Sequence, residues 1–258
     1  GMVLATDLRL AKTYTVPVAP PPIPGDAAAP ARGQHLAEVY CARCHGDRLE
    51  GAPLFADASL GTVDAPNLTG GRGGVGAAYT DADWVRAIRH GIRPDGRALF
   101  IMPAGDFQHL GAGDLAALIA YLKSVPPVDN ETRARTFTPL ARFLYTTGAF
   151  GNLIPAEWID HAAVEQEAAA VPQQGPTAEY GAYVATLGGC GGCHKPDLGG
   201  GTDDPSAPPA PNLTPGGELQ GWQEADFVRL MRTGTTPTGR QVSDYMPWKA
   251  YGRLHDEE

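Results

Sequence analysis

Two five-residue motifs in the sequence combine residue types that can hold a prosthetic group. They read CARCH at 41–45 and CGGCH at 190–194. In each motif two cysteines stand three positions apart, and a histidine directly follows the second. The candidate residues are Cys41, Cys44, His45, Cys190, Cys193 and His194. The chain has four cysteines in all, so these motifs leave none for a structural disulfide.

This spacing predicts covalent attachment of haem c. Residues three apart lie on one face of a helical turn, so both sulfurs can reach the two vinyl groups on one haem edge. The next residue then directs its imidazole at the iron. The alternatives are zinc knuckles and thioredoxin-like dithiols. A four-cysteine zinc site does not need a histidine after each pair, and a redox dithiol belongs in a βαβ context that is absent here. We therefore expect two haem c groups.

The motifs belong to an internal repeat. The same segments recur in the same order in both halves of the chain. They are PNLT at 66–69 and 211–214, DWVR at 83–86 and DFVR at 226–229, and Met-Pro at 102–103 and 246–247. The repeat predicts two similar domains, at 31–127 and 176–258.

Met102 and Met246 are the predicted sixth ligands of the two irons. Methionine and histidine together hold haem iron in cytochromes c, and the thioether raises the reduction potential. Of the four methionines, these two occupy matching positions, each before a proline. His90 is the rival in the first domain, but Thr233 stands at its place in the second. The other histidines outside the motifs are interpreted as surface or hydrogen-bonded residues.

Two matched prolines are candidates for orienting the ligating histidines. Pro66 and Pro211 lie about 20 residues after His45 and His194. A ligating histidine usually donates its second ring N–H to a fixed acceptor. Proline has a carbonyl, lacks an N–H and fixes φ, so we expect these prolines to supply that acceptor.

Matched aromatic and basic residues are candidates for the surroundings of each haem. Trp84 and Phe227 are expected to pack on or near the haem, since they hold equivalent positions. Arg89 and Arg232 also match and could neutralise a propionate, although a solvated helix face explains them equally well. Two further aromatic residues that could reach the propionates are Tyr79 and Trp222.

A few short helices must position these residues. Apolar residues at 36, 39 and 40 predict a helix that leads into the first motif. Thr80 and Gly91 are expected to bound a second helix. Asp114 and Pro126 are expected to bound a third, whose apolar residues recur at i, i+3, i+4 and i+7. We find no convincing strand pairs, so the predicted fold class is all-α, with long loops.

The remaining residues divide into a tether and a connector. Six prolines between 15 and 30 favour an extended, semi-rigid tether over 1–30, with order beginning near Arg32. Residues 128–175 form a connector between the domains. Its middle, 139–150, carries more large apolar residues than a bare linker would. We expect this connector to pack across both domains.

Composition and charge narrow the function classes. The 33 glycines and 24 prolines indicate a loop-rich fold, and small loop-rich domains often need a cofactor as an internal staple. The formal net charge of -9 argues against nucleic acid as a partner. It permits a basic protein partner.

The chain resembles the class I c-type cytochromes of bacteria in their dihaem, two-domain arrangement. The resemblance covers about 31–258 and rests on the two CxxCH motifs, the two Met-Pro pairs and the PNLT pairs. It is similar to the cytochrome subunits that accept electrons from membrane-bound dehydrogenases, although a third haem motif is missing. The resemblance implies that the first and last helices of each domain cross, at Gly33 and Tyr121 in the first domain.

The function expected from these features is electron transfer. With His/Met ligation neither iron is free to bind substrate, so each haem would take an electron from a redox donor protein and pass it to an acceptor. A membrane-bound dehydrogenase or oxidase is the partner that the resemblance implies. The rivals are a dihaem peroxidase, a thiosulfate-oxidising cytochrome and a haem-based gas sensor, and a peroxidase or gas sensor needs an iron with an open coordination position. The expected location is the periplasmic side of a bacterial membrane, with an N-terminal anchor that precedes the tether.

The second domain is expected to lack its last helix. The first domain runs 25 residues from Met102 to Pro127, whereas the second has 12 from Met246 to Glu258. Without that helix, residues Tyr180, Tyr183 and Val184 would face water.

Overall fold

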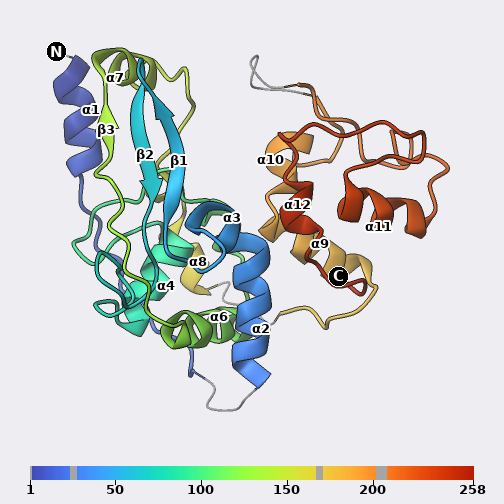
Figure 1. The fold of residues 1–258 in the computed structure, drawn as a ribbon, viewed down its shortest axis with the longest axis horizontal. Helices are drawn as coiled ribbons and strands as arrows, with labels where there is room; N and C mark the ends of the chain where they lie inside the picture. The colour runs from blue at the N-terminus through green and yellow to red at the C-terminus, as the bar shows by residue number, and fades with distance from the viewer. Residues whose placement is uncertain (1, 24–27, 167–170, 202–207) are drawn as a thin grey trace. The chain divides into compact units, whose positions relative to one another are not determined.

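The chain forms two compact units, Gly1–Val171 and Pro172–Glu258. The computed structural model describes residues 2–23, 28–166, 171–201 and 208–258 (Figure 1). The boundary lies four residues before the predicted start of the second domain at 176. The connector as far as Val171 therefore belongs with the first unit.

The first unit contains helices and strands on both sides of the first CxxCH motif in the sequence. In chain order they are α1 (Met2–Ala11), α2 (Ala28–Leu36), the π-helix η1 (Ala37–Cys41), α3 (Ala42–His45), β1 (Ala52–Asp57), β2 (Gly61–Ala65), α4 (Asp81–His90), α5 (Ala104–Phe107), α6 (Ala112–Ser124), β3 (Thr136–Phe137), α7 (Pro139–Thr146), the 3-10 helix η2 (Pro155–Glu157) and α8 (His161–Gln166). The second unit contains α9 (Ala178–Leu187), α10 (Cys190–His194), α11 (Glu224–Thr233) and α12 (Trp248–Tyr251).

Helices α2 and α6 cross at Gly33, where the resemblance placed the crossing. A Cβ at Gly33 would collide with the Ala117 carbonyl and lie 2.8 Å from the Cβ of Tyr121. The crossing is further held by an ion pair between Arg32 and Asp114, with Nε and Oδ1 2.9 Å apart. Asp114 therefore does not cap α6 as predicted. The helix begins two residues earlier, at Ala112, with Gly111 as its N-cap, and the Asp114 carboxylate pairs with Arg32 of α2.

Helix α4 begins and ends where the sequence predicted. Thr80 is its N-cap, and its hydroxyl accepts a hydrogen bond from the Asp83 backbone N–H. Gly91 ends it with φ +64, a left-handed conformation that glycine adopts without a Cβ clash. The matching helix α11 ends at Gly234 with φ +67, so the repeat extends to the backbone conformation.

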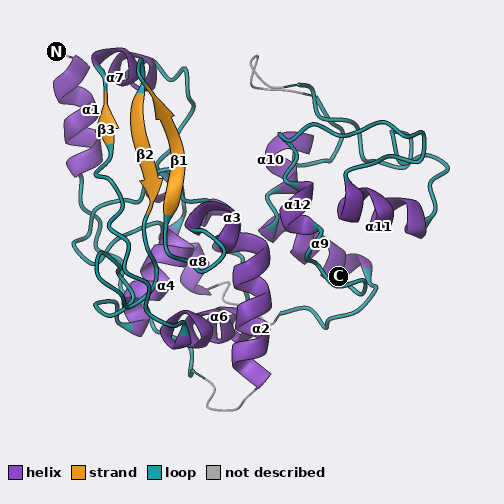
Figure 2. Cartoon of the chain, viewed as in Figure 1, coloured by secondary structure: helices purple, strands orange, loops and turns teal. Residues whose placement is uncertain are grey.

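A three-stranded antiparallel sheet corrects the expectation that the chain has no strand pairs. Strands β1 and β2 pair from Ala52 opposite Ala65 to Asp57 opposite Gly61, and β2 pairs with β3 where Gly61 faces Phe137. Figure 2 shows the named strands together in the first unit. Among the described residues, helices still supply most of the regular structure. The fold is therefore mainly helical with a small sheet, rather than all-α.

The N-terminal residues pack within the first unit, whereas we predicted an extended, semi-rigid tether over 1–30. Residues 12–23 form no helix. The backbone N–H of Tyr14 donates to the Gly96 carbonyl over 2.8 Å, and Val16 is buried. Helix α1 packs against α7 (Figure 1), and Arg9 forms an ion pair with Glu157. Order therefore begins well before Arg32.

The connector is packed, because its large apolar residues enter the core of the first unit. Tyr145 of α7 and Ile154 are buried together with Val16, Ile92 and Ala156. The predicted connector helix is thus present as α7. The buried side of α7 packs against the interior of the first unit.

The helix that leads into the second motif is covered, which corrects the prediction that it faces water. Tyr180 and Val184 are buried, and Tyr183 is half-buried. The Tyr180 hydroxyl donates to the Glu258 carboxylate over 3.1 Å. The Tyr251 hydroxyl donates to the carbonyl of Gly188. The turns after α12 thus contact residues that we expected a further helix to cover.

A search of the described residues for a membrane-spanning segment was negative. None of their helices combines the length and the apolar character that crossing a bilayer requires.

The Gly33 crossing generates the first prediction. Replacing Gly33 with alanine should lower the free energy of unfolding of the haem-loaded chain by about 1–3 kcal/mol, because the added methyl meets backbone that cannot give way. Chemical denaturation measures this. Gly181 in α9 is the matched control, since the space beside it is open. Gly181→Ala should be neutral or stabilising by up to about 1 kcal/mol. Equal stability of Gly33→Ala and the parent would contradict a tight crossing.

Candidate functional site

A π-helical turn brings the first motif to its position. Helix α2 passes into η1, and α3 then carries the motif to His45. A π-turn holds an extra residue within the helix and is frequent at functional sites. It leaves Val39 and Cys41 buried. Gly46, with φ +83, ends α3 directly after the histidine.

His45 is held by the proline that the sequence predicted. Its Nδ1 lies 2.8 Å from the Pro66 carbonyl, and a carbonyl only accepts, so Nδ1–H is the donor. Burial lowers the pKa of His45, which favours the neutral ring. The neutral ring with its proton on Nδ1 leaves Nε2 unprotonated and able to ligate a metal.

The second motif repeats this arrangement. His194 Nδ1 lies 2.8 Å from the Pro211 carbonyl, and the histidine is buried. The loop after each histidine also repeats. The N–H of Gly51 donates to the His45 carbonyl over 2.7 Å, and that of Gly200 donates to the His194 carbonyl over 2.9 Å.

The asparagine of each PNLT segment rigidifies the loop that carries the proline. The Asn67 Oδ1 accepts from the Thr69 backbone N–H over 2.9 Å, and the Asn212 Oδ1 accepts from Thr214 over 2.8 Å. Asn67 also donates to the Val128 carbonyl over 2.7 Å. Both units therefore repeat the proline carbonyl and also the asparagine contact that fixes its loop.

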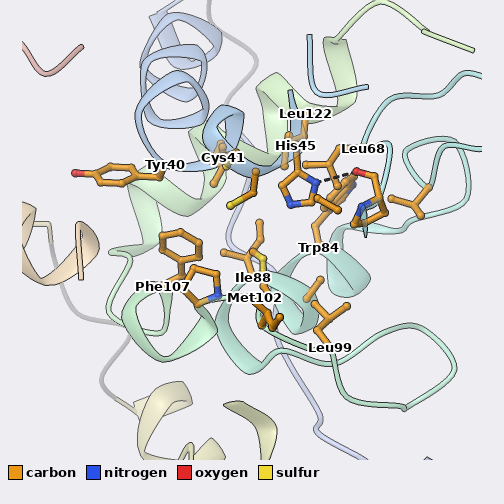
Figure 3. Close-up of a pocket in the computed structure, with 18 of the residues that line it drawn as sticks. Tyr40, Cys41, His45, Leu68, Trp84, Ile88, Leu99, Met102, Phe107 and Leu122 are labelled. Carbon is orange, nitrogen blue, oxygen red and sulfur yellow. Dashed lines mark hydrogen bonds between the residues drawn. The ribbon is translucent and has the colours of Figure 1, made fainter. Parts of the chain in front are cut away.

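An apolar cavity lies beside the first motif. Figure 3 shows His45 on one side of it, and Met102 and Ile88 on the other. Cys41, Cys44 and Trp84 also line it. An apolar pocket with a few placed polar groups suits a large planar cofactor.

Several lining residues were not singled out by the sequence. Leu36, Leu118 and Leu122 were visible only as helix stripes, because a helical period indicates a buried face without saying what covers it. Leu110 and Phe107 line the cavity from α5 and the turn after it. No sequence signal identified these two.

The two methionines occupy equivalent loops. In the first unit the Leu99 N–H donates to the carbonyl of Gly91 over 2.6 Å, and Met102 follows three residues later. In the second the Val242 N–H donates to the carbonyl of Gly234 over 2.8 Å, four residues before Met246. Each loop is thus closed onto the glycine that ends the preceding helix, and both methionines are half-buried.

Trp84 provides a test of whether the cavity fits haem. The side chain is 2% exposed, and its indole Nε1 has no hydrogen-bond partner among the described residues. A buried donor without a partner is costly. Haem carries two propionates, whose oxygens accept hydrogen bonds, so the unpaired N–H fits that group. Tyr79 supports the indole, with ring centroids 4.9 Å apart, and also lines the cavity.

The equivalent positions of the second unit differ. Phe227 stands at the place of Trp84, its ring has no N–H to donate, and the residue is 41% exposed. Trp222, the candidate matching Tyr79, is half-buried. The surroundings of the two sites are therefore unequal even though their ligand candidates match.

The matched arginines donate to backbone carbonyls near the ends of their helices. Arg89 is buried and donates to the Leu110 carbonyl. Arg232 donates to the Gly252 carbonyl and pairs with Asp256, their atoms 2.6 Å apart. Arg89 does not line the cavity. Both arginines tie the end of a helix to the turn after the methionine, which is a structural role that their matching positions also explain.

His90 is engaged away from the cavity. It is fully buried, with Nδ1 3.0 Å from the Nδ1 of His161 and Nε2 3.0 Å from the Glu165 carboxylate. Both ring nitrogens thus have partners on α8. Among the methionine and histidine side chains that line the cavity, Met102 is therefore the one that faces His45 across it.

The cysteines of the first motif do not have the character of a redox dithiol. Burial raises the pKa of Cys41 to about 12, and burial also raises the pKa of Cys44. Dithiol oxidoreductases need the opposite, a lowered thiol pKa. The arrangement favours the covalent attachment interpretation over the dithiol alternative.

Comparison with known proteins points in the same direction. Residues 28–122 match the family described as cytochrome c oxidase, cbb3-type, subunit III. The chain is 30% identical over 262 residues to the fructose dehydrogenase cytochrome subunit of Gluconobacter japonicus, covering 92% of this chain and 52% of that protein. It is 28% identical over 245 residues to a diheme cytochrome c-type of Cereibacter sphaeroides, covering 84% and 78%.

A nicotinate dehydrogenase subunit of Pseudomonas putida is 32% identical over 239 residues, which are 89% of this chain and 19% of that protein. The chain thus spans about half or less of the length of this relative and of the fructose dehydrogenase subunit.

The unpaired indole of Trp84 generates the second prediction. Trp84→Phe should raise the pKa of a propionate on the first haem, because its ionised form loses a donor. The pH at which the potential of that haem begins to change should move upward in a redox titration. Phe227→Leu is the control, and it should leave the first-haem profile unchanged. An identical profile for Trp84→Phe and the parent would contradict the contact.

Proposed function

We propose that this chain, a member of the c-type cytochromes, carries electrons between two redox proteins through two covalently bound haems. The observation that supports the second haem is the repeated geometry of the two motifs. Each has a histidine whose Nδ1–H donates to a proline carbonyl over 2.8 Å. A diheme relative matches most of the chain, which is consistent with this proposal.

Each haem would be held by residues of one unit. Cys41 and Cys44 would form thioethers in the first, and Cys190 and Cys193 in the second. The axial ligands would be His45 with Met102, and His194 with Met246. When bound, haem c supplies an iron that changes between its ferrous and ferric states. In the first unit, burial favours neutral His45, the Pro66 carbonyl orients its Nε2, and an apolar lining excludes water.

The chain is an electron carrier and does not itself catalyse a reaction. Relatives that match it are named as cytochrome subunits of fructose dehydrogenase and of quinone-dependent alcohol dehydrogenases. A methionine at the sixth position of each iron would leave no place for substrate. Electrons would then enter and leave through an exposed haem edge. The soft thioether also favours the reduced state, which suits a chain that accepts electrons.

The proposed donor is a dehydrogenase, and the proposed acceptor is a second redox protein. The relatives' names support the first of these partners. The net charge of -9 favours docking partners that present a basic surface, and nucleic acid is not among them. We place the chain on the periplasmic side of a bacterial membrane and propose attachment to that membrane. Fractionation of cells that express the natural gene tests the location.

Methionine replacement tests the ligand assignment. Met102→Ala and Met246→Ala should each remove about half of the weak sulfur-to-iron absorption band of the ferric protein, since each removes one of two equivalent bonds. Each should also lower one of the two reduction potentials. Absorption spectroscopy and a redox titration measure these effects.

The mass of the denatured variants is the control. Both variants should keep the mass of two haems, because the thioether bonds do not involve methionine. A band that persists in full in both variants would contradict the assignment.

A further inference from the structure

The loop that carries Met102 is strained and held from outside. Ile101, the residue before the methionine, has φ +67. This conformation is an outlier for a β-branched residue and persists only when surrounding structure enforces it. The Ile101 N–H donates to the Leu153 carbonyl over 2.9 Å. A connector residue therefore fixes the backbone directly before the ligand.

The connector also covers the helix that follows the methionine. The indole of Trp158 lies against Gly105 of α5, where a Cβ would collide with the ring. Ala104 of α5 forms a small buried cluster with Ile159 and Val164. The segment 153–165 thus contacts the methionine loop on both sides of Met102.

A histidine network fastens this segment to α4. His90 is fully buried at the end of α4, and its two ring nitrogens meet His161 Nδ1 and the Glu165 carboxylate, each at 3.0 Å. His161 Nε2 in turn lies 3.2 Å from the Ala156 carbonyl. The network joins α8 to α4. The loop that carries Met102 closes onto Gly91, the glycine that ends α4.

The second unit supports its methionine differently. Thr233 stands at the place of His90, and its hydroxyl donates to the carbonyl of Arg229 in its own helix. The ring of Trp248, two residues after Met246, lies against Gly234. Tyr245, the residue before the methionine, is 60% exposed. This loop is supported by residues of its own neighbourhood.

We propose that residues 153–165 are a brace for the Met102 loop, fastened by His90, His161 and Glu165, which keeps methionine on the first iron. The inference rests on the proposed His/Met ligation. Exchange of methionine for another ligand requires its loop to move away from the iron. The brace raises the cost of that movement in the first unit. The first iron therefore exchanges its methionine more slowly than it would without the brace.

Imidazole binding to the ferric, full-length, two-haem protein tests the brace at fixed pH. Loss of the sulfur-to-iron band reports exchange, and Met102→Ala and Met246→Ala identify which part of the band belongs to each haem. Trp158→Ala and His161→Ala should each speed exchange at the first haem by about tenfold, the size expected from losing one side-chain contact. Exchange at the second haem should not change.

Two control variants accompany these. Trp248→Ala should speed exchange at the second haem alone. His109→Gln replaces an exposed histidine outside the network and should change neither rate. Thermal unfolding of each variant shows whether the effect on ligand exchange is local. A merely structural role would lower the melting temperature without speeding exchange at one haem selectively.

The outcomes separate the two proposals. If Met102→Ala removes its share of the band while folded Trp158→Ala and His161→Ala exchange at the parent rate, the brace is wrong and the ligation stands. Equal acceleration at both haems also overturns the brace. If Met102→Ala leaves the band intact, the proposed ligation itself fails.

Discussion

The hydrogen bond from His45 to the carbonyl of Pro66 is the contact on which the proposed chemistry of the first unit depends. Because the carbonyl only accepts, it fixes the proton on Nδ1 and frees Nε2. The bond requires a rigid Pro66 loop, which Asn67 provides. It also requires the motif to end beneath that loop, and the π-turn and Gly46 achieve this. The same bond is present at His194 in the second unit.

The units share this chemistry but not the way they enclose it. The first unit adds a sheet, an N-terminal segment and the connector to the common helices, and its Trp84 is almost completely buried. The second has its matching Phe227 exposed. Burial and hydrogen bonding near the haem set its reduction potential. If both proposed haems have the same ligands, their potentials are therefore expected to differ.

The candidate site residues could be named from the sequence because motif spacing and the repeat identify them directly, and their roles as haem ligands stay a prediction. The proline acceptors and the limits of α4 followed from the same reasoning. The sheet could not be predicted, because β1 contains Pro53 and its register shifts between Pro53 and Phe55, which breaks the alternating pattern. Strand β3 has two residues and pairs across more than 70 positions. The packing of the N-terminal segment could not be predicted either, because the partners of Val16 and of helix α1 lie far along the chain.

Carbon monoxide titration of the reduced protein tests most directly whether the chain is a carrier with two closed irons. Carbon monoxide binds ferrous haem whose sixth position is open or easily opened. With Met102 and Met246 as ligands, the spectrum at neutral pH should not change at either haem. A spectral change at one or both haems would contradict this and favour an enzyme or a gas sensor.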